Sequence, residues 1–490
     1  MRRLISILLA IAMLLTLFGC EMKKVSERDS TYSGYSTESS SHETSFIGDS
    51  SEVSSLLTSE PDSEAYSSDI SKSAIASSDE SRVSSSQGAD ISSVPSVAVS
   101  SKKEANSVSS SKDSEKKITV SVKDQMRAVW LSYIELNFVG KSEEEFQNTI
   151  DTYFDNIKDL GCNTVICHVV ANCDAAYDSD IFPYSAAYSG KQGQSPGYDP
   201  LEYMVSAAKE RGLSIHAWIN PYRVCAQNKK TSALAQNNPA RKWLEDDSKS
   251  NDDNVLFTDT GMYLNPAKED VRKLVVSAVR EILENYDVDG IQFDDYFYPV
   301  TDEKFDKTTY DNYKKGRATY LPLDEWRRTN VNLLVSSVYK AVHKYKGKVF
   351  GISPAAPISE DKTDKNYTEY YADIYSWMET KGYIDYIAPQ LYFGYNYPKE
   401  EFRFDNILKS WTNAKRHKSV SLYIGLGVYK INTEDAETKE WIKDNEIISK
   451  QIRDIKKTDA EGFMLYSYSY LFSEDEKNRS ALKKIRKTLK

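Results

Sequence analysis

From Met126 onward, short runs of apolar residues alternate with longer segments in which the apolar positions recur at helical spacing. This alternation is typical of the strands of a parallel sheet and of the amphipathic helices that connect them. The runs that we expect to form strands are Ala128–Ile134, Thr164–Val169, Ser214–Ile219, Gly290–Asp294, Val349–Ser353, Tyr386–Leu391, Leu422–Leu426 and Phe463–Tyr466.

Helical spacing is clear in Glu143–Leu160, where Phe146, Ile150, Phe154 and Ile157 fall on one face. The other segments expected to form helices are Leu201–Arg211, Val271–Tyr286, Glu325–Tyr345, Tyr370–Thr380, Phe404–Asn413 and Ile447–Lys456. Strands and helices in this alternation predict an α/β fold of the (β/α)8 TIM-barrel type. An open, doubly wound, dinucleotide-binding sheet would need a G-x-G-x-x-G turn after its first strand, and the sequence lacks this turn.

The N-terminus has the pattern of a secretory signal peptide. Met1-Arg2-Arg3 is a positive region, Leu4–Phe18 is apolar, and the following Gly19-Cys20 completes a stretch that resembles a bacterial lipobox. In a lipobox the cysteine is lipidated and becomes the new N-terminus, so we expect Cys20 to carry acyl chains. An uncleaved signal anchor is the alternative. Either would place the rest of the chain in an extracytoplasmic location, attached to the cell membrane.

Residues 26–117 are dominated by serine and contain few aromatic or clustered β-branched residues. Such a segment cannot bury enough apolar surface to offset its chain entropy, so we predict a disordered tether. A flexible chain of this length has a root-mean-square reach of roughly 50–60 Å. The predicted organisation is a signal peptide at 1–19, a lipid-anchored linker at 20–117 and a barrel at 118–490.

The composition narrows the possible partners. The formal net charge is −10 and no basic patch stands out, so we expect no nucleic-acid partner. The 34 tyrosines and 7 tryptophans suit the binding of sugar rings, although a large core explains most of them. Cys162 and Cys167 are expected to be core thiols, whereas Cys173 and Cys225 fall in loops, where a disulfide is one alternative.

The active site of such a barrel forms where its strands end, and the fourth run ends in two carboxylates. Because side chains alternate along a strand, Gln292 and Asp294 should face the barrel axis, and Asp295 follows at the rim. Neighbouring carboxylates tend to split their pKa values, as acid/base chemistry requires. A helix cap or a structural ion pair is the alternative interpretation of this doublet.

The other strand ends are rich in side chains that could bind a polar ligand. The candidates for substrate binding are His168, His216, Trp218, Asn220, Tyr222, Arg223, Asn265, Tyr296, Tyr298, Gln390, Tyr392 and Tyr466. Asn265 could equally cap the helix that follows it. His168 and His216 on neighbouring strands raise the possibility of a metal site, but H-x-H and H-E-x-x-H patterns are absent, so we expect neither metal nor cofactor.

These strand ends point to carbohydrate chemistry. The sequence has no cysteine nucleophile with a histidine partner. A glycosidase usually needs two carboxylates, hydrogen-bonding groups and aromatic platforms. A glycosidase for another polysaccharide, a non-catalytic glycan-binding lipoprotein and a metal-dependent deacetylase remain as alternatives.

Four motifs in this order resemble those of the glycosyl-hydrolase-like family 10 proteins, many of which are bacterial lipoproteins. They are Arg127-Ala128-Val129-Trp130-Leu131, Trp218-Ile219-Asn220-Pro221-Tyr222-Arg223, Tyr263-Leu264-Asn265-Pro266 and the segment from Asp289 to Pro299. The resemblance covers about residues 125–485 and implies a (β/α)8 barrel that hydrolyses glycosidic bonds. At least one branch of the family acts on peptidoglycan glycan strands, particularly those stripped of stem peptides.

The catalytic residues that we expect are Asp294 and Asp295, without a fixed division of roles. No other strand end carries an obvious carboxylate except the first, with Glu135. The second catalytic group could therefore be Glu135, or the 2-acetamido group of the substrate itself.

Overall fold

The computed structural model describes residues 125–294 and 297–490 of the chain. The predicted signal peptide, Cys20 and the tether lie outside the described residues, and so do Asp295 and Tyr296. No helix within the described part is both long and apolar enough to cross a bilayer.

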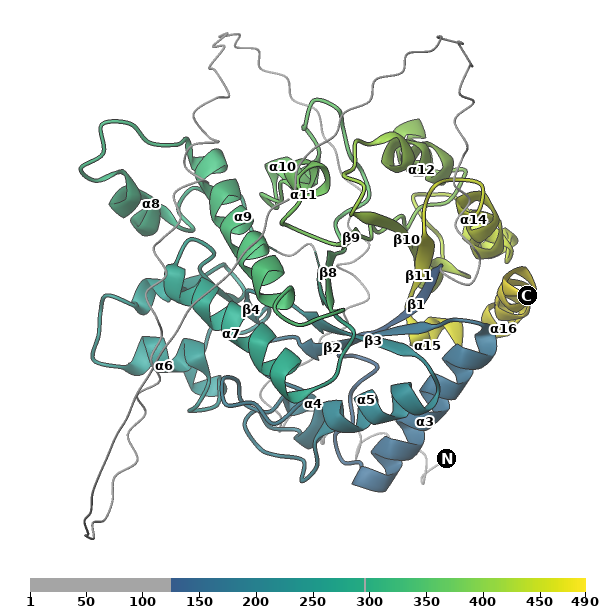
Figure 1. Cartoon of the computed structure of the whole chain (residues 1–490), viewed down its shortest axis with the longest axis horizontal. Coiled ribbons are helices and arrows are strands. Elements are labelled where there is room, and N and C mark those ends of the chain that lie inside the picture. Colours follow the sequence, from purple (N-terminus) through teal and green to yellow (C-terminus); the bar gives the residue numbers. More distant parts are fainter. Residues whose placement is uncertain (1–124, 295–296) are drawn as a thin grey trace, which may run out of the picture. The chain divides into compact units, whose positions relative to one another are not determined.

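The described residues form a closed barrel of eight parallel strands, with helices around it (Figure 1). The strands in their order around the barrel are β1 (Met126–Leu131), β11 (Gly462–Tyr466), β10 (Ser421–Gly427), β9 (Tyr386–Ile387), β8 (Val349–Ile352), β7 (Gly290–Phe293), β3 (Ser214–Ile219) and β2 (Thr164–Val170). The predicted (β/α)8 TIM barrel is thus confirmed, and each predicted strand matches one of these strands.

The outer ring consists of amphipathic helices whose apolar faces cover the strands (Figure 1). The longer helices are α3 (Glu143–Leu160), α5 (Pro200–Glu210), α7 (Glu269–Asn285), α9 (Leu323–Val342), α12 (Phe404–Asn413), α14 (Ile447–Ile455) and α16 (Glu476–Leu489). In α3, Ser142 and Glu145 form a capping box at the N-terminus, and Phe146 and Ile150 are among the buried residues. The shorter helices are α4 (Ala186–Ser189), α6 (Pro239–Glu245), α8 (Lys307–Lys314), α10 (Lys365–Thr368), α11 (Ile374–Glu379), α13 (Glu440–Lys443) and α15 (Tyr468–Leu471).

Between β3 and α7, the chain forms a small antiparallel sheet that the sequence pattern did not predict. It consists of β4 (Arg223–Cys225), β6 (Met262–Leu264) and β5 (Val255–Phe257), in that order. No disulfide joins Cys173 to Cys225, so that alternative is wrong, and Cys162 and Cys167 are buried thiols as predicted.

Candidate active site

Strand β7 delivers Asp294 to the mouth of the barrel. Ile291 and Phe293 are fully buried in the core between strands and helices, so the residues that alternate with them, Gln292 and Asp294, point the other way. This is the predicted alternation. Because Asp294 directly follows the last residue of β7, it lies at the carboxyl end of the barrel, where active sites of this fold form.

Two side chains from β3 and its exit loop hold the Asp294 carboxylate. Trp218 Nε1–H donates a hydrogen bond of 3.3 Å to Asp294 Oδ2, and Asn220 Nδ2 donates one of 3.0 Å to the same oxygen. Asp294 is only 4% exposed, so these donors replace water that it would otherwise bind. The predicted Asp294, Trp218 and Asn220 are therefore brought together by the pairing of β3 with β7.

His168 packs against the face of the Trp218 indole and holds it in place. Its imidazole stacks on the Trp218 indole, with ring centroids 3.7 Å apart and planes 9° apart. The neighbouring Tyr133 ring packs on His168 in a T-shaped arrangement, and the Arg223 guanidinium lies over Tyr133. Burial, together with the positive charge of Arg223, holds the pKa of His168 well below its usual value. His168 is therefore a neutral, buried ring that fixes the plane of Trp218, which is a supporting role where we predicted contact with substrate.

Two N–H groups of Arg223 already donate hydrogen bonds within the protein. Its Nε–H donates to the carbonyl oxygen of Ala171 at 3.0 Å, and its backbone N–H donates to Asn220 Oδ1 at 3.2 Å. The second contact orients the amide of Asn220, whose Nδ2 faces Asp294. Arg223 thus positions Asn220 from β4, and its side chain remains half-buried beside the mouth.

Glu135 has a different environment from Asp294. Its carboxylate accepts hydrogen bonds from the hydroxyl groups of Ser132, Ser467 and Ser469 and from the backbone N–H groups of Ser132 and Ser469. Ser132 follows β1, whereas Ser467 and Ser469 follow β11. Glu135 therefore ties together the ends of two adjacent strands, and this geometry favours a structural role over the predicted catalytic one.

Replacing Glu135 with glutamine is expected to lower stability more than activity. The glutamine amide would turn an N–H group toward the serine donors, and leaving buried donors unsatisfied costs about 1–3 kcal/mol. The free energy of unfolding should fall by this amount, while kcat of the folded protein stays within a few-fold, with the exposed Glu144→Gln in α3 as the control. A large loss of kcat at unchanged stability would instead restore Glu135 as the second catalytic carboxylate.

Two predicted residues meet on another part of the mouth, and a third links neighbouring strand ends. Tyr392 and Tyr466, which follow β9 and end β11, stack with ring centroids 5.7 Å apart. Both are half-buried. Gln390 donates from Nε2 to the carbonyl oxygen of Ser353 at 2.9 Å, which links the ends of β8 and β9.

His216 lies below the mouth, inside the barrel, which corrects its prediction as a substrate ligand. It is 2% exposed, and its Nδ1 is 3.0 Å from the hydroxyl oxygen of Tyr386. That hydroxyl donates to Gln292 Oε1 at 3.2 Å, so it accepts its bond from His216. Burial lowers the pKa of His216 to about 4, and the ring is neutral. Within the described ranges, no three His, Cys, Asp or Glu side chains are placed to hold a metal ion.

Three more predictions of substrate contact are corrected by burial. Tyr222 is fully buried and packs on Phe297, and Tyr298 is 1% exposed in the same region of the core. Asn265 is also fully buried: its Nδ2 donates to Asp253 and Thr309, and its Oδ1 accepts from the backbone of Ala267. The capping alternative for Asn265 is also wrong, because the N-cap of α7 is Lys268, and Asn265 instead stabilises the turn before this helix.

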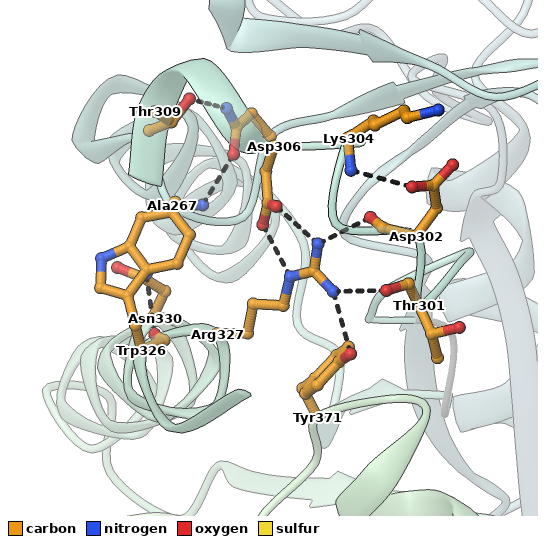
Figure 2. A network of polar contacts seen from close by, with 11 residues as sticks. Ala267, Thr301, Asp302, Lys304, Asp306, Thr309, Trp326, Arg327, Asn330 and Tyr371 are labelled. Carbon is orange, nitrogen blue, oxygen red and sulfur yellow. Dashed lines mark hydrogen bonds and ion pairs between the residues drawn. The ribbon is translucent and has the colours of Figure 1, made fainter. Parts of the chain in front are cut away.

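The sequence pattern did not indicate the ion pair that holds the segment before α8. Arg327 in α9 and Asp306 are both fully buried, and Arg327 binds both carboxylate oxygens, at 2.9 Å and 2.6 Å (Figure 2). Its remaining N–H groups donate to the carbonyl oxygens of Thr301 and Asp302 and to the hydroxyl of Tyr371. All five guanidinium donors are thus used, and four of them hold the segment from Thr301 to Asp306, directly before α8.

Solved structures with a similar chain course include two glycoside hydrolases. The glycoside hydrolase domain of PgaB (BpsB) from Bordetella bronchiseptica is 14% identical, with a TM-score of 0.47, and the alignment covers 73% of this chain and 98% of that one. The catalytic domain of beta-amylase from Paenibacillus polymyxa is 12% identical, with a TM-score of 0.49, and the coverage is 75% and 99%.

Sequence comparison gives stronger likenesses. Glycosyl hydrolase YngK of Bacillus subtilis (strain 168) is 34% identical over 327 residues, which are 63% of this chain and 61% of that protein. Glycosyl hydrolase DigH of Escherichia coli (strain K12) is 32% identical over 347 residues, or 65% and 76%. The match with YngK thus spans less than two thirds of that relative. The family model described as Glycosyl hydrolase-like 10 matches residues 125–443, and the chain belongs to this family.

Proposed function

We propose that this protein is a glycoside hydrolase that cleaves peptidoglycan glycan strands, with Asp294 as a catalytic carboxylate. The observation that carries the proposal is the position of Asp294 at the carboxyl end of β7, with one oxygen fixed by Trp218 and Asn220. A carboxylate held in this way is preorganised for reaction, because its orientation does not have to be found anew in each catalytic cycle.

Hydrolysis of a glycosidic bond needs a proton donor for the leaving oxygen and a second group on the other side of the sugar. Asp294 supplies one of these groups. The second is Asp295, its neighbour in the chain, or the 2-acetamido group of the substrate, since Glu135 is occupied by serine donors. Both routes are open to peptidoglycan, whose glycan strands consist of N-acetylated sugars.

The proposed substrate agrees with the proposed location of the protein. The signal peptide, lipidation at Cys20 and a serine-rich tether would place the barrel outside the cytoplasm, within reach of the cell wall. The partners that we propose are therefore the membrane, through acyl chains on Cys20, and the polysaccharide, through the barrel mouth.

The direct test is to incubate the full-length protein with intact cell-wall glycan and with glycan stripped of its peptides by an amidase, and to measure new reducing ends. We expect release, and faster release from the stripped strands. Release only from other polysaccharides would contradict the peptidoglycan assignment. Binding of glycan without release from any polysaccharide would contradict hydrolysis and favour the non-catalytic alternative.

A further inference from the structure

Five aromatic side chains form a continuous group at the end of four neighbouring strands, which we call the aromatic arc. Its members are Trp130, Tyr392, Tyr429, Tyr466 and Tyr470. Neighbouring ring centroids are 5.6–6.1 Å apart, in stacked, tilted and edge-on arrangements. Of these five residues, only Tyr392 and Tyr466 were predicted from the sequence to contact substrate.

Two glycines in β10 make room for this arc. Leu422, Ile424 and Leu426 of β10 are fully buried on the helix side, so Gly425 and Gly427 face the barrel axis. A Cβ atom on Gly425 would lie 3.2 Å from the Trp130 ring, and one on Gly427 would lie 3.0–3.2 Å from Tyr392. Small residues at both positions therefore let two large rings lie against the strand.

The arc lies across the mouth from Asp294. In the order of strands around the barrel, β11 is four places from β7, and β10 is four places from β3, which in a ring of eight is the opposite side. Asp294, Trp218 and Asn220 come from β7 and β3, whereas Tyr466 ends β11 and Tyr429 follows β10. A ligand that contacts both Asp294 and the rings at the rim must therefore extend across the opening.

The aromatic arc is more exposed to solvent than an ordinary aromatic core. Trp130 is buried at its base, but Tyr392, Tyr429 and Tyr466 are half-buried and Tyr470 is 46% exposed. An aromatic ring that is open to solvent on one face gains most when a ring with apolar C–H groups, such as a sugar, covers that face. The arc thus becomes more accessible from the barrel interior toward its rim.

We propose that Tyr429, Tyr466 and Tyr470 form a sugar-stacking platform that gives the protein its preference for long glycan strands over short fragments. This proposal rests on the proposed function, because it assigns the platform to the same substrate. A strand whose sugar is bound at Asp294 extends across the mouth, and its more distant sugars stack on the platform. A disaccharide bound at Asp294 places fewer sugars on the platform than a strand does, and its affinity therefore depends less on these rings.

The test compares Tyr470→Ala and Tyr429→Ala with Tyr470→Trp, which retains a stacking surface. Binding is measured calorimetrically with amidase-stripped glycan strands and with their disaccharide unit, in proteins that also carry Asp294→Asn so that cleavage does not interfere. We expect each alanine variant to bind the strands about 10-fold more weakly and to lose clearly less affinity for the disaccharide, and we expect Tyr470→Trp to retain strand affinity. Tyr320→Ala is the matched control, because Tyr320 is 54% exposed and lies between α8 and α9.

The same variants with Asp294 intact should show a higher KM for strands at nearly unchanged kcat. Unchanged strand affinity in both alanine variants, at unchanged melting temperature, would overturn the platform even if hydrolysis is observed. Weaker strand binding in these variants, in a protein that releases no reducing ends, would keep the platform and overturn the hydrolase assignment.

Discussion

Replacing Asp294 with asparagine is expected to lower the rate of glycan hydrolysis by about 10²–10⁴-fold, the usual contribution of a positioned acid or base. Asparagine has almost the same shape, and its Oδ1 can accept the hydrogen bonds from Trp218 and Asn220 that now end on one carboxylate oxygen. The substitution therefore removes charge and proton-transfer capacity while it keeps the packing. Initial rates of reducing-end release, together with thermal unfolding, measure the two effects separately.

The matched control for this variant is Asp289→Asn at the opposite end of the same strand. Asp289 precedes β7, and its Oδ2 accepts the backbone N–H of Ile215 at 2.9 Å. The amino end of a barrel strand contributes to stability and not to catalysis, so this variant should retain kcat and lose some stability. Equal kcat values for the two variants would remove Asp294 from the mechanism.

The ends of most strands could be predicted, because each strand of a parallel barrel is buried on both faces and appears in the sequence as its own apolar run. The run Ser214–Ile219 was predicted with its exact bounds, and alternation along β7 placed Asp294 inside the mouth. Prediction was less accurate for the run Tyr386–Leu391, whose regular strand β9 ends at Ile387. Pro389 follows, and a proline cannot donate the hydrogen bond that continued pairing would need.

Side chains in loops were not predictable from alternation, because period-two spacing holds only within a strand. Tyr222 follows β3 and Tyr298 follows β7, the two strands that position Asp294 and its partners. Both residues are aromatic, yet both are buried in the core. In the aromatic arc, residues that no sequence pattern connects come together in the fold. Tyr429 and Tyr470 lie 41 positions apart in the sequence, and only the adjacency of β10 and β11 brings their rings to 6.0 Å.

The buried ion pair between Arg327 and Asp306 is expected to contribute strongly to the stability of the fold. Arg327→Met is expected to reduce the free energy of unfolding by about 3–5 kcal/mol, because Asp306 would remain as a buried carboxylate without its partner. Urea titration measures this loss. The neighbouring Arg328→Met in α9 is the control, since Arg328 is only partly buried, and its guanidinium stacks on Tyr367. A loss of similar size in both variants would show that the ion pair has no special weight.

The double variant Arg327→Met with Asp306→Leu separates stability from positioning. Replacing both members of a buried pair by apolar residues of similar volume is often neutral or stabilising, so much of the lost stability should return. The hydrogen bonds from Arg327 to the carbonyl oxygens of Thr301 and Asp302 would still be missing, and these hold the segment that leads into α8 (Figure 2). Hydrolysis by the double variant should therefore remain low although the protein is stable. Recovery of kcat together with stability would mean that the pair supports the fold alone, and that Asp294 is held sufficiently by Trp218 and Asn220.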